Sequence, residues 1–429
     1  MAIVSVREHG KLAVGTPRSD LPVVSAAIAT DITAIKKVYG FEVFKYVNAT
    51  TIAAQQYVGV LQTGTEIVEV LPKIAGDDDH VRRNLVGMLS VALDLDIGEG
   101  EIARVGKQTQ GVLEMLIRLY CDKLFEQVRR GLGRRYETLE ENLCVMRGRL
   151  SIPAQIQKNA ANPERLYCHF DEFHEDNPLN VILKASVRFL LKRSRSFSNQ
   201  QRLSELLLAL KGVSDCAPAS LPWPRVNFDR LNERYKPCYR LAELFLRRAS
   251  PDVTAGGTHG FSLFFDMNLL FEEYIGRVAL RVLARHGLRG RLQGPRRFLA
   301  YDTATDKAAF AMKPDLVAMM DLEPRIILDT KWKRLSPEES KEGVAQADLY
   351  QMYAYASCYG CGNVVLVYPH DSPLGECAGV RRMFRLNTSR RGTQPAESTT
   401  LSIATVDLTD LRLVSSQLER IFAPMHKLF

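Results

Sequence analysis

The 429-residue sequence contains no run of about 18 or more apolar residues, the length that a helix needs to cross a bilayer. Its first residues, MAIVSVREHGKLAVG, also lack a basic segment followed by an apolar one, so we expect no secretory signal peptide. The eight cysteines are scattered through apolar or helical surroundings, which favours reduced thiols over a disulfide framework. We therefore expect a cytoplasmic protein with no membrane partner.

The sequence also lacks a G-x-x-x-x-G-K-[ST] phosphate loop, so we expect this chain to bind no nucleotide. What it does contain is ordinary for a soluble globular protein, with 46% hydrophobic and 25% charged residues. Its length is sufficient for two or three domains. The net charge of +8 permits a polyanionic partner such as nucleic acid without requiring one.

The pattern of apolar residues predicts three domains. Residues 1–104 look β-rich, because AAQQYVGVLQ and TEIVEVLPKI flank a glycine turn as in a hairpin. Helix-period stripes such as GVLEMLIRLYCDKLFEQVRRGL predict a helical domain over residues 105–245. In residues 246–429 a helix, three strands, a helix and a strand predict a mixed sheet with helices on its faces. The expected fold class is α+β multidomain, with a β-rich and helical N-terminal half and a C-terminal α/β domain.

The stretch KPDLVAMMDLEPRIILDTKWKR, residues 313–334, carries charged residues within predicted strands. Strand alternation places Asp329 and Lys331 on one face, and pairing through the LEP turn would bring Asp315 close to Asp329. Two carboxylates and a backbone carbonyl, that of Thr330, are hard oxygen ligands suited to Mg²⁺, with Mn²⁺ as a substitute. Such a metal activates water and binds a phosphate, while Lys331 could orient that water. The alternative is a surface hairpin with an Asp–Lys ion pair.

Two neighbouring helices add polar side chains to this hairpin. FEEY, residues 271–274, includes Glu272, and a later helix places Gln351 and Tyr355 four residues apart on one face. The whole constellation resembles the PD-(D/E)xK nuclease superfamily, whose motif is matched here by Asp315, Asp329 and Lys331. The resemblance implies that Glu272 is an extra catalytic carboxylate. It also implies that Gln351 and Tyr355 hold DNA beside the metal, as in the RecB-like branch.

Several phrases in order along the chain resemble the McrC subunit family of McrBC-type, modified-cytosine-dependent restriction systems. They are YVGVLQTGTEIVEVLPKI, RGRLSI, CHFDEFHEDNPLNVILKAS, FDMNLLFEEYIG, KPDLVAMMD, ILDTKWK and DLYQMYAYA. The resemblance implies a Mg²⁺-dependent endonuclease that docks on an McrB-like AAA+ GTPase hexamer through residues 1–104 and cleaves modified double-stranded DNA. Two alternatives stay open, namely a stand-alone RecB-like exonuclease and a non-catalytic adaptor that regulates the GTPase.

Two further segments allow a functional and a structural interpretation. RRMFRLNTSRRG, residues 381–392, is a solvated loop or a set of phosphate contacts. On the second interpretation, replacing Arg390 and Arg391 with Ala weakens DNA binding and flattens its salt dependence. FDEFHED, residues 170–176, is a second metal site or, as we expect, the solvated start of a helix whose N-terminal dipole favours carboxylates.

Overall fold

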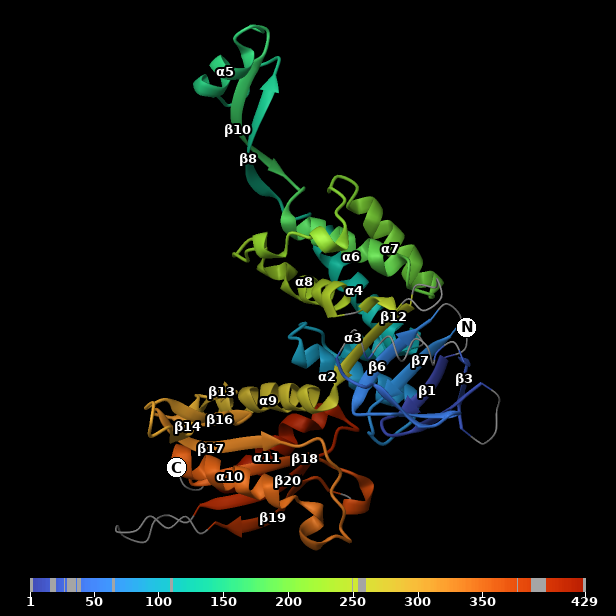
Figure 1. Cartoon of the computed structure of the whole chain (residues 1–429), viewed down its shortest axis with the longest axis vertical. Coiled ribbons are helices and arrows are strands. Elements are labelled where there is room, and N and C mark those ends of the chain that lie inside the picture. The colour runs from blue at the N-terminus through green and yellow to red at the C-terminus, as the bar shows by residue number, and fades with distance from the viewer. Residues whose placement is uncertain are drawn as a thin grey trace. The chain divides into compact units, whose positions relative to one another are not determined.

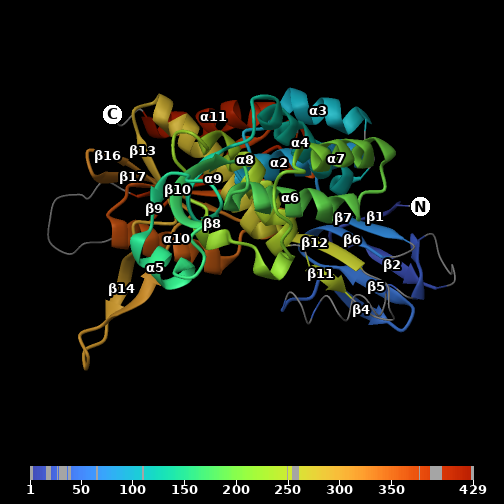
Figure 2. The same ribbon diagram turned by 90° about the horizontal axis from the view of Figure 1, so that it is seen from above.

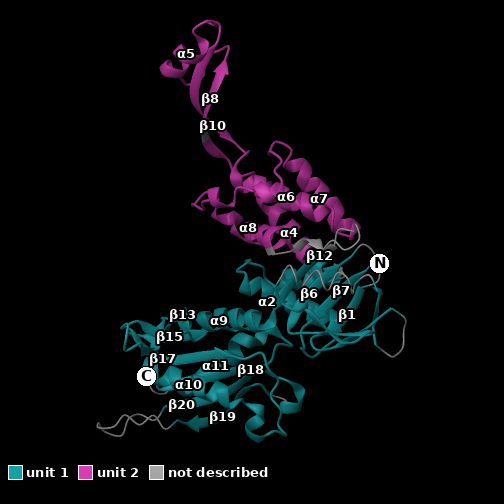
Figure 3. Ribbon diagram, viewed as in Figure 1, with its two compact units in different colours: residues 1–115, 250–429 teal, residues 116–249 magenta. Residues whose placement is uncertain are grey.

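A computed structural model describes residues 3–15, 21–26, 28, 36, 40–63, 66–108, 111–248, 250–253, 260–375, 377–386 and 399–426. The chain divides into two compact units (Figure 3). Unit 1 combines Met1–Met115 with Ser250–Phe429, and unit 2 is Leu116–Ala249. Both units mix helices and strands, and the sheets include parallel and antiparallel pairs. None of the helices in the described ranges is long and apolar enough to cross a membrane.

The N-terminal part of unit 1 contains the predicted hairpin. Strands β6 (Tyr57–Gln62) and β7 (Ile67–Leu71) pair antiparallel, which confirms that prediction. They belong to a sheet whose described strands follow the order β1 (Ile3–Arg7), β7, β6, β12 (Gly260–Asp266) and β11 (Ser250–Val253). A second sheet has the order β3 (Val23–Val24), β2 (Lys11–Val14), β5 (Thr51–Ala54) and β4 (Phe44–Asn48). Apolar side chains from both sheets form one core cluster.

Strand β12 explains why residues after 250 belong to the same unit as the N-terminus. It pairs antiparallel with β6 along its length, from Phe261 opposite Gln62 to Asp266 opposite Tyr57. A Cβ atom at Gly59 would lie 2.0 Å from the carbonyl oxygen of Leu263, so only glycine allows the two strands to approach this closely. The domain boundaries at 104 and 245 stay a prediction, but the pairing of β12 with β6 joins the first and third predicted domains in one sheet.

Helices α2 (Asp78–Ala92) and α3 (Glu99–Gln108) follow the N-terminal sheet. The Asp77 side chain caps α2 by accepting a hydrogen bond from the backbone N–H of His80 at 2.7 Å. Helix α2 packs against α9 (Met267–Arg285), and Asn84 Nδ2 donates to the carbonyl oxygen of Leu408 at 2.8 Å. The helix therefore ties the N-terminal sheet to the C-terminal part of unit 1.

Unit 2 is mainly helical, but it also contains an unpredicted sheet. Its helices include all but the first turn of α4 (Val112–Arg129), and α6 (Pro178–Leu191), α7 (Phe197–Ala209) and α8 (Lys236–Glu243). Long strands β8 (Arg135–Leu143) and β10 (Leu166–His174) form an antiparallel ribbon, with β9 (Arg149–Leu150) and α5 (Ile152–Asn159) between them in sequence (Figure 1). Exposed apolar side chains on this part of the unit are Tyr136, Val145, Met146, Ile152, Ile156 and Phe173.

The expectation that FDEFHED starts a helix is wrong for most of its residues. Asp171 to His174 lie in β10, and α6 begins only at Pro178. The helix is capped by Asn177, whose side chain accepts from the N–H of Asn180 at 3.1 Å. Two acidic residues of the segment instead accept hydrogen bonds from hydroxyl groups, Asp171 from Thr138 and Asp176 from Ser214.

The C-terminal part of unit 1 is a mixed sheet covered by helices (Figure 1), as expected from the order of its elements. In the described part of the chain its strands follow the order β13 (Arg289–Leu292), β16 (Leu316–Met320), β17 (Glu323–Thr330), β18 (Asn363–Pro369), β20 (Thr400–Val406) and β19 (Gly379–Arg385). Strands β17, β18 and β20 are parallel. Helix α10 (Gln346–Tyr359) packs against β17 and β18, and α11 (Val414–His426) closes the unit.

Three strands of this region differ from the prediction. β13 and β15 (Ala308–Met312) were not expected, and β15 pairs with β14 (Arg297–Tyr301) in a hairpin separate from the main sheet. β15 reads AAFAM, and its alanines carry little strand propensity. The arginines at 381, 382 and 385 lie in β19 and not in a solvated loop. Arg390 and Arg391 lie outside the described residues.

Candidate active site

The hairpin of β16 and β17 brings the two predicted aspartates to the same level. Leu316 lies opposite Leu328, so Asp315 and Asp329 each extend one residue beyond this pair. The turn differs from the predicted LEP. It consists of Asp321 and Leu322, whose φ angles are 49° and 72°, and positive values at both positions suit a tight two-residue hairpin turn. The following Glu323 and Pro324 already belong to β17.

Asp315, Asp329 and Lys331 lie together at the end of this hairpin. Asp315 Oδ2 accepts hydrogen bonds from both the backbone N–H and the hydroxyl group of Thr330, each at 2.7 Å. Asp329 is only 1% exposed, and its Oδ2 lies 2.6 Å from the ammonium nitrogen of Lys331. Despite this ion-pair distance, Asp329 Oδ2 has no partner in hydrogen-bonding geometry among the described residues. The site therefore contains a buried carboxylate oxygen with spare capacity to bind a cation.

Burial and neighbouring charges shift the pKa values of the site residues. Burial raises the pKa of Asp315 to about 7, and the charges of Asp329 and Glu272 add to this effect. Burial also raises the pKa of Asp329, although the ammonium group of Lys331 opposes the shift. Burial acts to lower the pKa of Lys331, but the charge of Asp329 outweighs it and the pKa is raised. Lys331 is thus a cation at neutral pH, while the two carboxylates do not ionise together easily.

This donor set fits a hard divalent cation that keeps most of its water. Asp315, Asp329 and the Thr330 carbonyl supply only oxygen, which is what Mg²⁺ prefers, and its sites often use one or two carboxylates. In the described ranges no group of three or more His, Cys, Asp or Glu side chains is arranged to hold a metal. Burial raises the pKa values of both carboxylates, and the charge of Asp329 raises that of Asp315 further. A cation would favour the ionised forms of both groups.

Helix α10 presents Gln351 and Tyr355 to Lys331. Lys331 Nζ donates to Gln351 Oε1 at 2.9 Å, and Gln351 Nε2 donates to the Tyr355 hydroxyl oxygen at 2.9 Å. The Tyr355 hydroxyl in turn donates to the carbonyl oxygen of Lys313 at 3.1 Å. Burial raises the pKa of Tyr355 well above its usual value, so this hydroxyl keeps its proton. The spacing of four residues thus creates a chain of hydrogen bonds that fixes the ammonium group of Lys331.

Of the two glutamates in FEEY, Glu272 is the one that acts on the site. Its negative charge contributes to the raised pKa of Asp315, whereas Glu273 pairs with Arg277 on the same helix at 3.1 Å. Glu272 Oε1 accepts from Gln293 Nε2 at 3.1 Å, and the Gln293 backbone N–H donates to the carbonyl oxygen of Asp315 at 2.8 Å. Gln293 was not predicted, because nothing in its local sequence marks it.

Asp348 is a second residue that the sequence did not single out. It lies on α10, three residues before Gln351, and its charge acts on the pKa values of both Asp329 and Lys331. Tyr368 donates its hydroxyl hydrogen to Asp348 Oδ2 at 3.2 Å. The spacing of three residues from Gln351 on a helix was the available signal.

The residue after Lys331 connects the site to the N-terminal sheet. The Trp332 indole nitrogen donates to both carboxylate oxygens of Glu8, at 3.0 and 3.1 Å, and Glu8 also accepts from the backbone N–H of Lys73. Burial raises the pKa of Glu8. The ring of Phe271, next to Glu272 in sequence, lies 5.2 Å from that of Trp332. Residues that follow β1 and β7, together with Phe271 of α9, thus contact Trp332 just beyond the end of β17.

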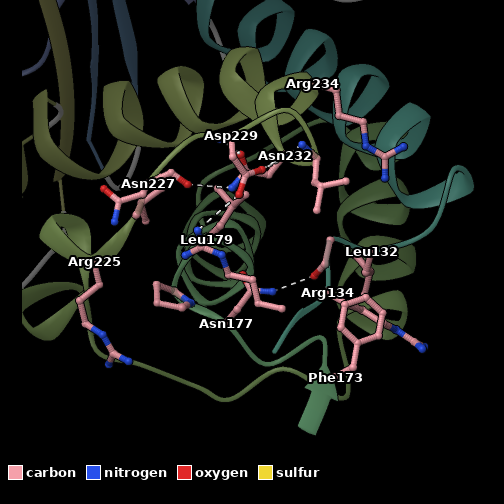
Figure 4. A pocket seen from close by; sticks show the side chains of 15 residues that line it. Leu132, Arg134, Phe173, Asn177, Leu179, Arg225, Asn227, Asp229, Asn232 and Arg234 are labelled. Atoms are coloured by element: carbon pink, nitrogen blue, oxygen red, sulfur yellow. Dashed lines mark hydrogen bonds and ion pairs between the residues drawn. The ribbon is translucent and has the colours of Figure 1, made fainter. Parts of the chain in front are cut away.

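Unit 2 contains a separate polar pocket of about 200 Å³ (Figure 4). Its charged lining residues are Arg134, Arg135, Arg225, Asp229 and Arg234. Arg135 lies 3.6 Å from Asp229, and Arg234 donates to the carbonyl oxygen of Gly131 at 2.8 Å. Asn177, the cap of α6, donates to the carbonyl oxygen of Gly133 at 2.7 Å. These contacts within unit 2 indicate that the polar residues of the pocket join the β8–β10 ribbon to the helices.

Comparison with known proteins relates the chain to one family. The family model described as McrBC 5-methylcytosine restriction system component matches residues 52–369, a range that includes Glu272, Asp315, Asp329 and Lys331. A comparison with curated proteins found no match.

Two solved structures from Thermococcus gammatolerans are similar to this chain. A chain in the refined half-complex from the tetradecameric assembly of McrB AAA+ hexamers with bound McrC has 22% identity and a TM-score of 0.72. That similarity covers 99% of this chain and 100% of the other. A chain in the cryo-EM structure of the McrBC complex has 26% identity and a TM-score of 0.55, over 66% of this chain and 88% of the other.

Proposed function

This chain belongs to the family of McrBC 5-methylcytosine restriction system components, and from this premise we propose that it is the Mg²⁺-dependent DNA endonuclease subunit of such a system. In this proposal residues 246–429 are a PD-(D/E)xK nuclease domain. The observation that carries the proposal is the buried Asp329, paired with Lys331 and level with Asp315 at the end of a strand in a mixed sheet. A carboxylate this buried is costly unless it serves chemistry or a specific structure.

In this proposal one set of groups binds the metal ion and another positions the attacking water. Asp315, Asp329 and the Thr330 carbonyl would hold Mg²⁺, with Mn²⁺ as a substitute. The ion supplies a water of lowered pKa and positive charge for the scissile phosphate. Thr330 fixes Asp315 through two hydrogen bonds, so one carboxylate oxygen is already oriented before an ion binds. Glu272 would contribute a further carboxylate next to Asp315.

Lys331 would orient the attacking water and neutralise charge that develops on the phosphate. Its ammonium group donates to Gln351 and lies 2.6 Å from Asp329 Oδ2 as an ion pair. The Lys331 side chain is 27% exposed, so a water or a phosphate oxygen could reach the ammonium group. Gln351 and Tyr355 hold the ammonium group in place, and they would lie beside the DNA backbone during cleavage.

We also propose that the chain acts together with an AAA+ GTPase hexamer of the McrB type. This is supported by the similar chain in the Thermococcus structure, in which McrC is bound to McrB AAA+ hexamers. The sequence prediction assigns docking to residues 1–104. The exposed apolar side chains of the ribbon in unit 2, such as Val145 and Ile156, make that ribbon a second candidate. Loss of GTPase stimulation after Ile156→Ser, but not after Tyr46→Ser in β4, would assign docking to the ribbon.

The experiment that tests the nuclease proposal uses Asp329→Asn in the complete complex with its GTPase. We expect the wild type to cut 5-methylcytosine-containing plasmid DNA with Mg²⁺ and GTP, and the variant to cut at least 100-fold more slowly. GTP hydrolysis should be stimulated equally by both. Asp321→Asn is the matched control, because Asp321 is exposed in the turn of the same hairpin. Wild-type cutting by Asp329→Asn would refute the site, and degradation of DNA ends by the chain with Mg²⁺ alone would favour the RecB-like exonuclease.

A further inference from the structure

The hairpin of β14 and β15 stands apart from the sheet that carries the site. Among the described strands, β14 and β15 pair only with each other, and Figure 2 shows β14 running out beyond the six-stranded sheet. β15 ends at Met312, three residues before Asp315. A two-stranded hairpin is marginally stable by itself in water, so its projection from a folded unit calls for a role.

The surface of this hairpin is unusually apolar for a segment that is largely exposed. Tyr301 is 65% exposed and Phe310 is 73% exposed, and Phe298 and Leu299 are also exposed. The aromatic rings are therefore available to a partner and contribute little to the core of unit 1. An exposed cluster of this kind on a soluble protein indicates an interaction surface.

The charge around the hairpin identifies the class of partner. Residues 289–313 contain six exposed cationic side chains and only two acidic ones, Asp302 and Asp306. The cations are Arg289, Arg291, Arg296, Arg297, Lys307 and Lys313. The resulting net charge of +4 is half of the +8 of the whole chain. Exposed cations interleaved with aromatic rings fit a nucleic acid, whereas two copies of this surface would repel each other.

The base of the hairpin is fixed to the helix that positions Lys331. The Tyr359 hydroxyl of α10 donates to the carbonyl oxygen of Met312 at 3.1 Å and also to that of Pro295. Arg297 Nη1 donates to the carbonyl oxygen of Cys358 at 2.7 Å. One helix thus anchors both strands of the hairpin and supplies Gln351 to the site, so a partner held by the hairpin is held at a fixed position relative to the carboxylates.

We propose that the β14–β15 hairpin is a DNA-contacting ribbon that enters the major groove of the duplex beside the phosphate to be cut. The inference rests on the proposed nuclease function, because the hairpin would contact the same DNA that the site cuts. The major groove is about 12 Å wide and accepts a two-stranded β-ribbon. Five residues per strand span about 17 Å, enough to cross it. Tyr301 and Phe310 contact the bases, while Arg296 and Lys307 contact phosphates.

The test measures binding of the full chain to a fluorescent 5-methylcytosine-containing duplex in EDTA, at several salt concentrations. Tyr301→Ala/Phe310→Ala should bind at least about 5-fold more weakly, because the apolar contacts of both rings with base edges in the major groove are lost. Arg296→Ala/Lys307→Ala should lower the slope of log affinity against log salt by about 1.8, or about 0.9 for each lost phosphate contact. Wild-type affinity and slope in both variants would overturn the inference.

Controls separate this inference from the nuclease proposal. Phe197→Ala/Lys45→Ala removes one exposed aromatic ring and one exposed cation elsewhere in the chain, and should bind like the wild type. Asp329→Asn should keep its affinity and lose cutting. If Asp329→Asn still cuts DNA while the hairpin variants lose affinity, the catalytic role of Asp329 is refuted and the DNA-contacting role of the β14–β15 hairpin is supported. If the hairpin variants bind DNA normally but sediment differently, the β14–β15 hairpin is a contact between copies of the chain, and its proposed contact with DNA is refuted.

Discussion

Asp315→Asn should make the metal-free protein more stable at pH 8 while it removes cleavage. In the wild type, burial and the charges of Asp329 and Glu272 raise the pKa of Asp315 from 3.8 to about 7. At about 1.4 kcal/mol for each pKa unit, ionising Asp315 costs up to about 4 kcal/mol more in the folded protein than in the unfolded chain. The side chain is partly exposed to water, which screens part of this cost, so we expect a gain of about 1–3 kcal/mol. Asparagine keeps an oxygen that can accept both hydrogen bonds from Thr330.

The gain should depend on pH in a defined direction. Between about pH 4 and pH 7 the folded protein keeps a proton on Asp315 that the unfolded chain releases. The stabilisation from this proton is complete below about pH 4 and is lost as the pH rises through about 7. The advantage of the asparagine variant is therefore full above pH 7 and shrinks as the pH falls towards 4.

The chain contains two tryptophans, which makes a clean assay available. In a Trp223→Phe background the fluorescence of Trp332 reports the unfolding of unit 1, because Trp332 follows the site directly and Trp223 lies in unit 2. Urea unfolding of both proteins should be compared at about pH 8 and about pH 4.5, in EDTA and in about 10 mM Mg²⁺. Added Mg²⁺ should stabilise only the wild type. If the asparagine variant is less stable in EDTA at pH 8, or gains equally from Mg²⁺, the two carboxylates do not form an ion site.

Three further substitutions test the surroundings of the site. Lys331→Ala removes the cation beside a buried carboxylate and should abolish cutting and destabilise the protein by about 1–3 kcal/mol, measured by urea unfolding. Tyr355→Phe removes the hydroxyl that fixes Gln351 and should slow cutting about 3- to 10-fold without weakening DNA binding; an unchanged single-turnover rate contradicts this role. Trp332→Phe leaves the buried Glu8 without its indole donor and should cost about 1–3 kcal/mol, whereas unaltered thermal unfolding would show that the bond adds nothing.

The parts of the site that could be predicted depend on short-range periodicity. Asp329 and Lys331 are two residues apart, so the alternation of a strand relates them, and Gln351 and Tyr355 are four apart, so the turn of a helix does. The structure brings these four side chains together through the ion pair and hydrogen bonds described above. The mixed sheet likewise follows from the order of helices and strands.

The parts that could not be predicted depend on contacts between distant residues. Glu8 and Trp332 are 324 positions apart, and neither stands in a motif that marks the other. The pairing of β12 with β6 is equally long-range, and the sequence of β12 does not indicate its partner. Gln293 acts through its backbone and an amide in a turn, where side-chain patterns carry little information.

The contact between Glu8 and Trp332 has a consequence for how this protein can be divided. Trp332, the residue after Lys331, donates its indole N–H to both carboxylate oxygens of Glu8, which directly follows β1. A fragment starting at residue 246 would lose that anchor and also the strand against which β12 is built. We therefore do not expect the candidate active site to form in an isolated C-terminal fragment. The first strands of the chain support it as much as the sheet on which its aspartates lie.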